Sequence, residues 1–73
     1  MDEGRAKVKT MLDRNSLTQV WLINRLSERG VRTEKTEFSS VLRGTRKGFK
    51  AERIVAVSLE ILEHYEKQME TGA

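Results

Sequence analysis

The sequence predicts an all-α fold, a compact single domain of four to five helices with a long C-terminal helix, which spans residues 1–73. Apolar residues recur at helical spacing rather than in the strict alternation of a strand. No proline interrupts the chain, and most glycines lie between the apolar segments, where helices end. A chain of this length has room for one small core.

The composition limits how so short a chain can be stabilised. A domain of this size buries only about 60–65% of the surface that its unfolded form exposes, so we expect good helix packing and a partner subunit. Cysteine is absent, which excludes disulfides and thiolate metal sites, and the lone His64 cannot build a zinc site. We therefore expect no metal and no cofactor.

The chain also lacks the signals of a membrane or secreted protein. No stretch approaches the ~20 apolar residues of a membrane span, and residues 1–4 precede no apolar signal core. We expect an intracellular, soluble protein.

The first two helices are expected over residues 1–15 and 16–30. In the second, Ser16 and Gln19 match a capping box, in which the Ser16 hydroxyl accepts the backbone N–H of Gln19 while the Gln19 side chain reaches back. Gly30 follows as a left-handed stop. The apolar stripe of the first helix is Val8, Met11 and Leu12, and that of the second is Leu17, Val20 or Trp21, Leu22, Ile23 and Leu26.

The third helix is expected over residues 33–43, with Thr33 as its N-cap and Gly44 as its stop. Its inward side chains are Phe38, Val41 and Leu42. A tight, basic loop follows over residues 45–48.

The last helix is expected over residues 49–70, either as one long helix or as two short helices with a break near Ser58. Two neighbouring apolar stripes give it a wider apolar surface than a small core needs. We expect the surplus to form the seam of a homodimer. The seam residues are Val55, Leu59, Leu62 and Tyr65. The carboxylates of Glu60, Glu63 and Glu66 have no His or Cys partner in range and are interpreted as a solvated acidic face.

Charge is distributed unevenly, although the net charge of +3 is small. Between Arg32 and Arg53 seven basic residues stand against three acidic ones, whereas from Ser58 onward glutamates dominate. A polyanion is expected to dock on the basic middle of the chain and to avoid its acidic end. The alternative is that these charges are only solvated faces.

The second and third helices together are a candidate DNA-reading unit. In a helix-turn-helix the second helix enters the major groove, so it needs an apolar inner face and short polar or basic side chains outside. The outer residues here are Lys35, Thr36, Ser39, Ser40 and Arg43. Serine and threonine allow close approach to base edges, and lysine or arginine pairs with guanine acceptors. The alternative is the ordinary polar face of a short amphipathic helix.

Two phrases of the sequence resemble a known family. The run 17–23 (LTQVWLI) and the later run 38–46 (FSSVLRGTR) resemble the helix-turn-helix of Cro/repressor-type regulators of phages and bacteria, the lambda-repressor-like or XRE-type proteins. The resemblance covers about residues 7–62. Ile23 and Ser27 depart from the small alanine and the turn glycine that the family usually has, and the connection between the two helices is longer.

The resemblance implies a small transcriptional regulator, a repressor or Cro-like switch, that binds a palindromic operator in double-stranded DNA as a homodimer. The residues expected to read bases are Lys35, Thr36, Ser39 and Ser40. The residues expected to bind phosphates are Thr18, Gln19, Arg43, Thr45, Arg46, Lys47 and Lys50. For Thr18 and Gln19 the resemblance implies either a phosphate contact or a buttress for the recognition helix.

Two other classes of function compete with DNA binding. A protein-binding antirepressor or inhibitor would keep the helix-turn-helix and dock on another regulator through its C-terminal helix. An enzyme is not expected, because the sequence has no nucleophile with a base, no metal-ligand spacing and no phosphate-cradling glycine loop. Trp21 is interpreted as packing at the edge of the core rather than as a platform for unpaired bases.

Overall fold

The computed structural model describes residues 3–72, which form four α-helices and no strand. The all-α prediction is therefore confirmed. The helices are α1 (Glu3–Arg14), α2 (Gln19–Glu28), α3 (Lys35–Arg43) and α4 (Phe49–Gly72). Residues 1 and 2, where the first helix was expected to begin, lie outside the described range.

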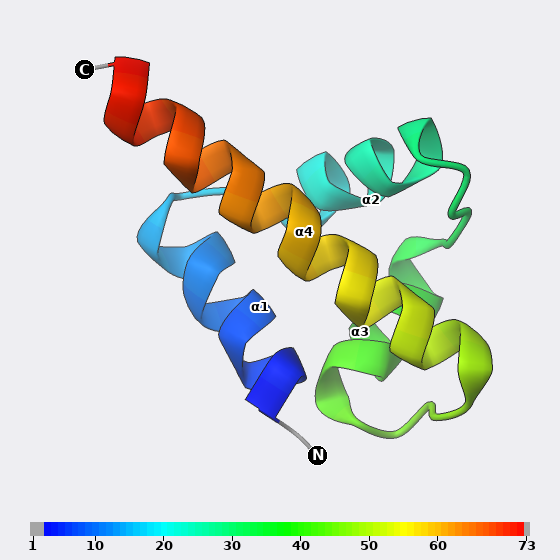
Figure 1. Ribbon diagram of the computed structural model, residues 1–73. Helices are drawn as coiled ribbons and strands as arrows, with labels where there is room; N and C mark the ends of the chain where they lie inside the picture. The colour runs from blue at the N-terminus through cyan, green and yellow to red at the C-terminus, as the bar shows by residue number, and fades with distance from the viewer. Residues whose placement is uncertain (1–2, 73) are drawn as a thin grey trace.

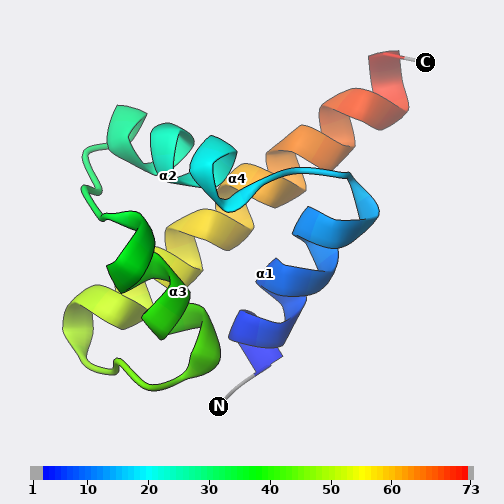
Figure 2. The same ribbon diagram turned by 180° about the vertical axis from the view of Figure 1, so that it is seen from behind.

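The long helix α4 crosses one face of the molecule, and the three shorter helices pack behind it (Figures 1 and 2). α4 contacts α1, α2 and α3, and α3 also contacts α1 and α2. The core therefore lies between α4 and the layer made by the other helices.

Most of the core is built from the apolar stripes that the sequence predicts, but Val31 and Ala51 were not predicted to be part of it, and Val20 is 50% exposed. The buried members of the core are Val8, Met11, Leu12, Leu22, Leu26, Val31, Phe38, Val41, Leu42, Ala51, Ile54, Ile61 and Leu62. Phe38 is the largest of the fully buried side chains. Full burial of one such large side chain stabilises the fold by roughly 1.5–3 kcal/mol, so the inward residues of α3 fix that helix firmly to the scaffold.

α4 is one continuous helix of 24 residues, which decides between the two arrangements expected for this segment. No glycine or proline interrupts it between residues 49 and 71. Ser58, where a break was considered, is fully buried inside the helix, and its hydroxyl has no hydrogen-bond partner among the described residues. No helix within residues 3–72 is both long and apolar enough to cross a membrane.

The predicted capping box at Ser16 is wrong. Ser16 has a left-handed φ of +56° and belongs to the turn that ends α1, where the N–H of Leu17 donates to the carbonyl of Leu12 at 2.8 Å. α2 starts later, at Gln19. Its N-cap is Thr18, whose hydroxyl accepts the backbone N–H of Trp21 at 3.0 Å.

The predicted N-cap of the third helix is also wrong. α3 begins at Lys35, and Glu34 occupies the capping position without a side-chain hydrogen bond to the helix. Thr33 lies one residue further out, where its hydroxyl donates to a carboxylate oxygen of Glu37 at 2.6 Å. Thr33 therefore binds the side of α3 rather than capping its backbone.

Candidate nucleic-acid interface

The connection between α2 and α3 is anchored, although it is longer than a tight turn. The N–H of Val31 donates to the carbonyl of Leu26 at 2.9 Å, and the N–H of Gly30 donates to that of Ser27 at 3.0 Å. This helix ending needs a left-handed residue, and Gly30 has a φ of +81°. Because Val31 is buried in the core, the connection holds α3 in a fixed position against α2.

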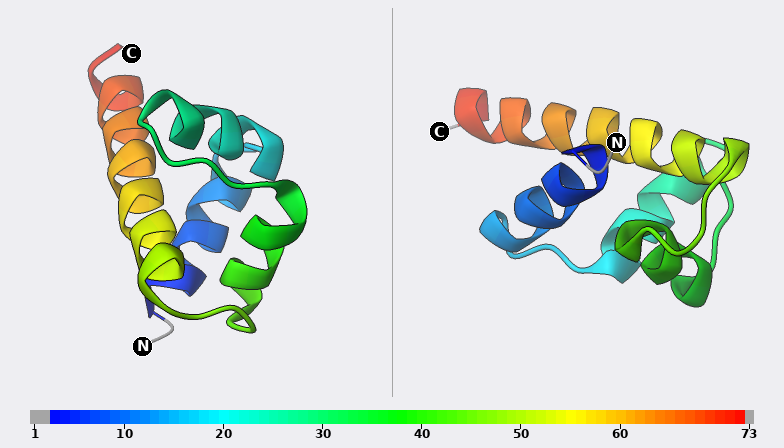
Figure 3. Two further views of the ribbon diagram at one scale, coloured as in Figure 1. Left: turned by 90° about the vertical axis from the view of Figure 1, so that its right-hand side faces the viewer. Right: turned by 90° about the horizontal axis from the view of Figure 1, so that it is seen from below.

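α3 turns a polar face away from the core. Its outward residues are Lys35, Thr36, Ser39, Ser40 and Arg43, of which the two serines are half-buried and the others exposed. The guanidinium of Arg43 lies 3.4 Å from the hydroxyl of Ser40 and donates to it. In Figure 3 (right), α3 lies on the opposite side of the molecule from α4, which leaves its outward face open.

The first residue of α2 is tied to this face. The hydroxyl of Ser39 donates to the side-chain oxygen of Gln19 at 2.8 Å, and both side chains are half-buried. Thr18, Gln19, Val20, Lys35 and Ser39 together line one shallow hollow in the surface. The start of α2 and the outward face of α3 therefore form one continuous surface, and Gln19 braces α3.

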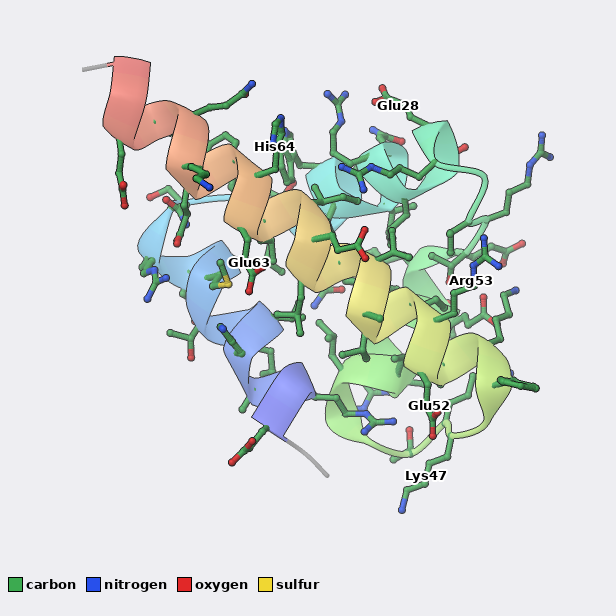
Figure 4. All side chains as sticks on the ribbon, in the orientation of Figure 1. Glu28, Lys47, Glu52, Arg53, Glu63 and His64 are labelled. Atoms are coloured by element: carbon green, nitrogen blue, oxygen red, sulfur yellow. The ribbon has the colours of Figure 1, made fainter. Side chains whose placement is uncertain are left out.

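The loop over residues 44–48 continues this surface at the other end of α3. Gly44, with a φ of +83°, closes the helix, and both the N–H and the hydroxyl of Thr45 donate to the carbonyl of Ser40 at 3.1 Å. The polar groups of Thr45 thus turn back onto α3. Lys47 is exposed, and Figure 4 shows it extending away from the body of the protein.

Two of the predicted phosphate-binding cations are paired within the chain. The carboxylate of Glu37 lies 3.2 Å from the ammonium of Lys50 and 3.9 Å from the guanidinium of Arg46. The hydrogen bond from Thr33 lowers the pKa of Glu37 most, Lys50 and Arg46 lower it further, and partial burial opposes them. Sequence reasoning did not single out Glu37. Its signal was an acid in the first turn of an otherwise basic helix.

The other side of α2 carries an aromatic pair. The rings of Trp21 and Tyr65 meet edge to face with their centroids 5.3 Å apart, and the guanidinium of Arg25 lies 5.7 Å from the centre of the Trp21 ring. Trp21 is half-buried and packs against the core. Its predicted place at the edge of the core is confirmed.

The interpretation of these carboxylates as a solvated acidic face holds for Glu60 and Glu63, which are exposed, whereas Glu66 is half-buried. Each of the three also forms an ion pair with another helix or its end, which the sequence did not predict. Glu60 lies 3.3 Å from Arg29, Glu63 lies 3.4 Å from Lys7, and Glu66 lies 2.7 Å from Arg14. These carboxylates join α4 to α1 and to the end of α2. Sequence alone does not reveal such pairs, since they depend on how the helices pack.

The residues predicted for a dimer seam do not form a free surface. Leu62 is fully buried in the core of this chain, so its assignment to the seam is wrong. Val55 and Leu59 are half-buried and face α1 at Gly4, where an added Cβ would lie 2.9 Å from Val55 and 3.7 Å from Leu59. Tyr65 packs on Trp21. These contacts are made within one chain.

Comparison with protein-family models, with curated proteins and with solved structures finds no match to this chain. Within residues 3–72 no group of three or more His, Cys, Asp or Glu side chains is arranged to hold a metal ion. The surface formed by the start of α2, the outward face of α3 and the loop 44–48 is the site with the strongest chemical character, since it gathers hydroxyls, an amide and cations on neighbouring elements.

Proposed function

We propose that this chain binds double-stranded DNA in a sequence-specific manner, as a small transcriptional regulator of the Cro/repressor type in the bacterial cytosol. α3 enters the major groove, and the start of α2 and the loop 44–48 contact the phosphates on either side. The observation that carries this proposal is the polar outward face of α3, which the Gln19–Ser39 hydrogen bond holds beside the first turn of α2.

The dimensions of α3 suit the groove. A helix with its side chains is about 10–12 Å across, and the major groove of B-form DNA is about 12 Å wide. The outward face of α3 carries no large apolar side chain that would keep the helix from the base edges. We assign base reading to Lys35, Thr36 and Ser40, because lysine pairs with guanine and hydroxyls pair with several base edges.

Ser39 has a different role from the one that the sequence suggests. Its hydroxyl proton is committed to Gln19, so we assign Ser39 to positioning α3 rather than to reading bases. A helix held by this bond keeps its orientation when the protein docks. Less conformational freedom is then lost on binding.

The phosphate contacts come from both ends of this surface. At one end, Thr18 and Gln19 begin α2, and a helix start attracts phosphate through its backbone N–H groups. At the other end Lys47 extends into solvent, whereas Arg46 and Lys50 are shared with Glu37. Arg43 at the end of α3 completes the set. A phosphate must compete with Glu37 for two of these cations.

A homodimer on a palindromic operator is part of the same proposal. Two copies related by a two-fold axis would place their α3 helices in successive major grooves, about 34 Å apart. Analytical ultracentrifugation of the protein on its best DNA site measures the number of chains bound. Two chains for each palindrome are expected. A single chain bound to a single half-site would contradict the homodimer.

The experiment that tests DNA reading compares three variants on that site and on scrambled DNA. Lys47→Ala is expected to weaken binding to both sequences and to reduce the slope of log affinity against log salt by about one. Thr36→Ala is expected to weaken binding mainly to the specific site, by about 1–3 kcal/mol. Lys67→Ala, near the end of α4, is the control and should change neither value. Equal losses of DNA affinity in Lys47→Ala, Thr36→Ala and Lys67→Ala would contradict the assignment of this surface to DNA binding.

One observation favours the alternative, a protein-binding regulator that docks through α4. The last turns of α4 extend past the ends of α1 and α2 (Figures 1 and 2), and Met69 on them is 60% exposed. A regulator of this kind has little need for the cations of the loop 44–48. Binding of duplex DNA that depends on Lys47 and on sequence therefore separates the two functions.

A further inference from the structure

Phe49, the first residue of α4, is 95% exposed. The other exposed large apolar side chains of the described residues do not come near this value, since Val20 is 50% and Met69 60% exposed. The buried residues of α4 begin only at Ala51. Phe49 therefore contributes almost nothing to the core, although a phenylalanine ring is among the side chains that gain most from burial.

The surface around Phe49 is cationic. Within residues 46–53 four basic residues stand against Glu52, and Glu37 of α3 pairs with two of them, Arg46 and Lys50. Phe49, Lys50, Glu52 and Arg53 line one hollow in the surface. Lys47 and Arg53 are exposed and form no ion pair with another residue of the range 3–72, and Lys47 extends outward in Figure 4. An apolar ring beside cations suits a ligand that carries both anionic groups, which the cations can pair with, and flat or apolar faces, on which the ring can pack.

We propose that Phe49 contacts DNA directly, with its ring packed against a sugar and the adjoining base beside the phosphate that Lys47 neutralises. This inference rests on the proposed function and adds to it a contact that is not electrostatic. The place of Phe49 supports it, because only the loop 44–48 separates this residue from α3. Apolar side chains that reach the base stack, and aromatic rings that lie on bases, are established modes of contact with nucleic acids.

A protein partner fits this surface less well. An apolar protein surface would leave Lys47 and Arg53 without counterions, and burying them unpaired would oppose binding. DNA supplies phosphates for the cations and sugar and base faces for the ring within a few ångströms of each other. Charge complementarity thus favours nucleic acid as the occupant.

Salt dependence separates this contact from the phosphate contacts. Phe49→Ala is expected to lower the affinity for the best DNA site about tenfold at every salt concentration, with an unchanged salt slope. Lys47→Ala is expected to reduce the slope by about one. Met69→Ala removes another exposed apolar side chain at the far end of α4 and is expected to leave both values unchanged. Because Phe49 is exposed, its removal should leave the thermal unfolding midpoint unchanged.

Photocrosslinking tests the contact directly. The photoreactive residue p-benzoylphenylalanine in place of Phe49 is expected to crosslink to the bound duplex, and the same residue in place of Met69 is not.

Unchanged affinity of Phe49→Ala together with no crosslink at position 49, on DNA that the unaltered protein binds, would overturn the inference and leave the proposed function standing. Failure of the unaltered protein to bind any duplex would instead overturn the proposed function. A smaller sedimentation mass of free Phe49→Ala would assign the ring to a contact between copies and would also overturn the inference.

Discussion

The guanidinium of Arg14 donates two hydrogen bonds of 2.7 Å to the carboxylate of Glu66, one from Nε and one from Nη2. The bonds join the last residue of α1 to the outer part of α4. The amide of Asn15 donates to the same carboxylate at 2.5 Å. A paired fork of this kind holds two side chains in one geometry more tightly than a single ion pair does, so it ties the end of α1 to α4.

The first prediction concerns acid stability. The hydrogen bonds from Arg14, then that from Asn15, lower the pKa of Glu66 to about 2 from an ordinary value of 4.5. A carboxylate whose pKa is lower in the folded state stabilises the fold above its unfolded pKa and loses this effect as the pH falls toward the folded value. Urea unfolding midpoints are therefore expected to fall between pH 4.5 and 2, and Glu66→Gln should reduce that fall. An equal fall in both proteins would contradict the role given to this pair.

The second prediction concerns Glu37 and DNA affinity. Glu37→Gln removes the carboxylate that Lys50 and Arg46 share, so both cations become available to phosphates. Affinity for duplex DNA at low salt is expected to rise about three- to tenfold, with a steeper salt slope. Glu63→Gln removes an acid that pairs with Lys7 on α1 and is the control. Weaker binding by Glu37→Gln would show that this carboxylate positions the cations rather than competing for them.

The third prediction concerns Ser58. Its hydroxyl is fully buried without a partner among the described residues, and burying an unpaired hydroxyl costs about 1–3 kcal/mol. Ser58→Ala is therefore expected to raise the free energy of unfolding by about 1 kcal/mol, as measured by urea denaturation. A loss of stability of that size would mean that the hydroxyl has a partner in solution.

The fourth prediction concerns the helix ends. Ser16 adopts a left-handed φ of +56° without being glycine, a conformation that costs an ordinary residue about 1–2 kcal/mol. Ser16→Gly is expected to raise the free energy of unfolding by about 1 kcal/mol. Gly44→Ala is the matched change in the opposite direction at a φ of +83°, and it should destabilise by a similar amount. A fall in stability on Ser16→Gly would indicate that the hydroxyl matters more than the backbone.

The sequence was sufficient for most of the core and for the order of the helices, because the spacing of apolar residues is a local property. It did not predict the burial of Val31 and Ala51 or the exposure of Val20. It did not decide between competing caps. Ser16 and Thr18 both suit the start of a helix, and the choice depends on the turn that ends α1, where the N–H of Leu17 bonds to Leu12. Local pattern cannot rank two such candidates when the preceding helix determines which one is free.

The charged side chains were the hardest part of the surface to predict. A glutamate in a helix is equally compatible with solvent and with an ion pair, and the pairs of Glu60, Glu63 and Glu66 appear only when α4 packs on its neighbours. Glu37 was missed for the same reason. The exposure of Phe49 was also not predicted, since an aromatic residue at the start of an amphipathic helix gives no local sign of which way it points.

The measurement that tests DNA reading most directly is selection of the purified protein against a randomised duplex library, followed by titration of the best site and of scrambled DNA at two salt concentrations. Enrichment of a short palindrome, bound about 10³-fold or more tightly than scrambled DNA, is expected from a dimer that reads bases through α3. No enrichment, with weak binding that vanishes at modest salt, would contradict sequence-specific binding and reduce the loop 44–48 to a non-specific basic patch.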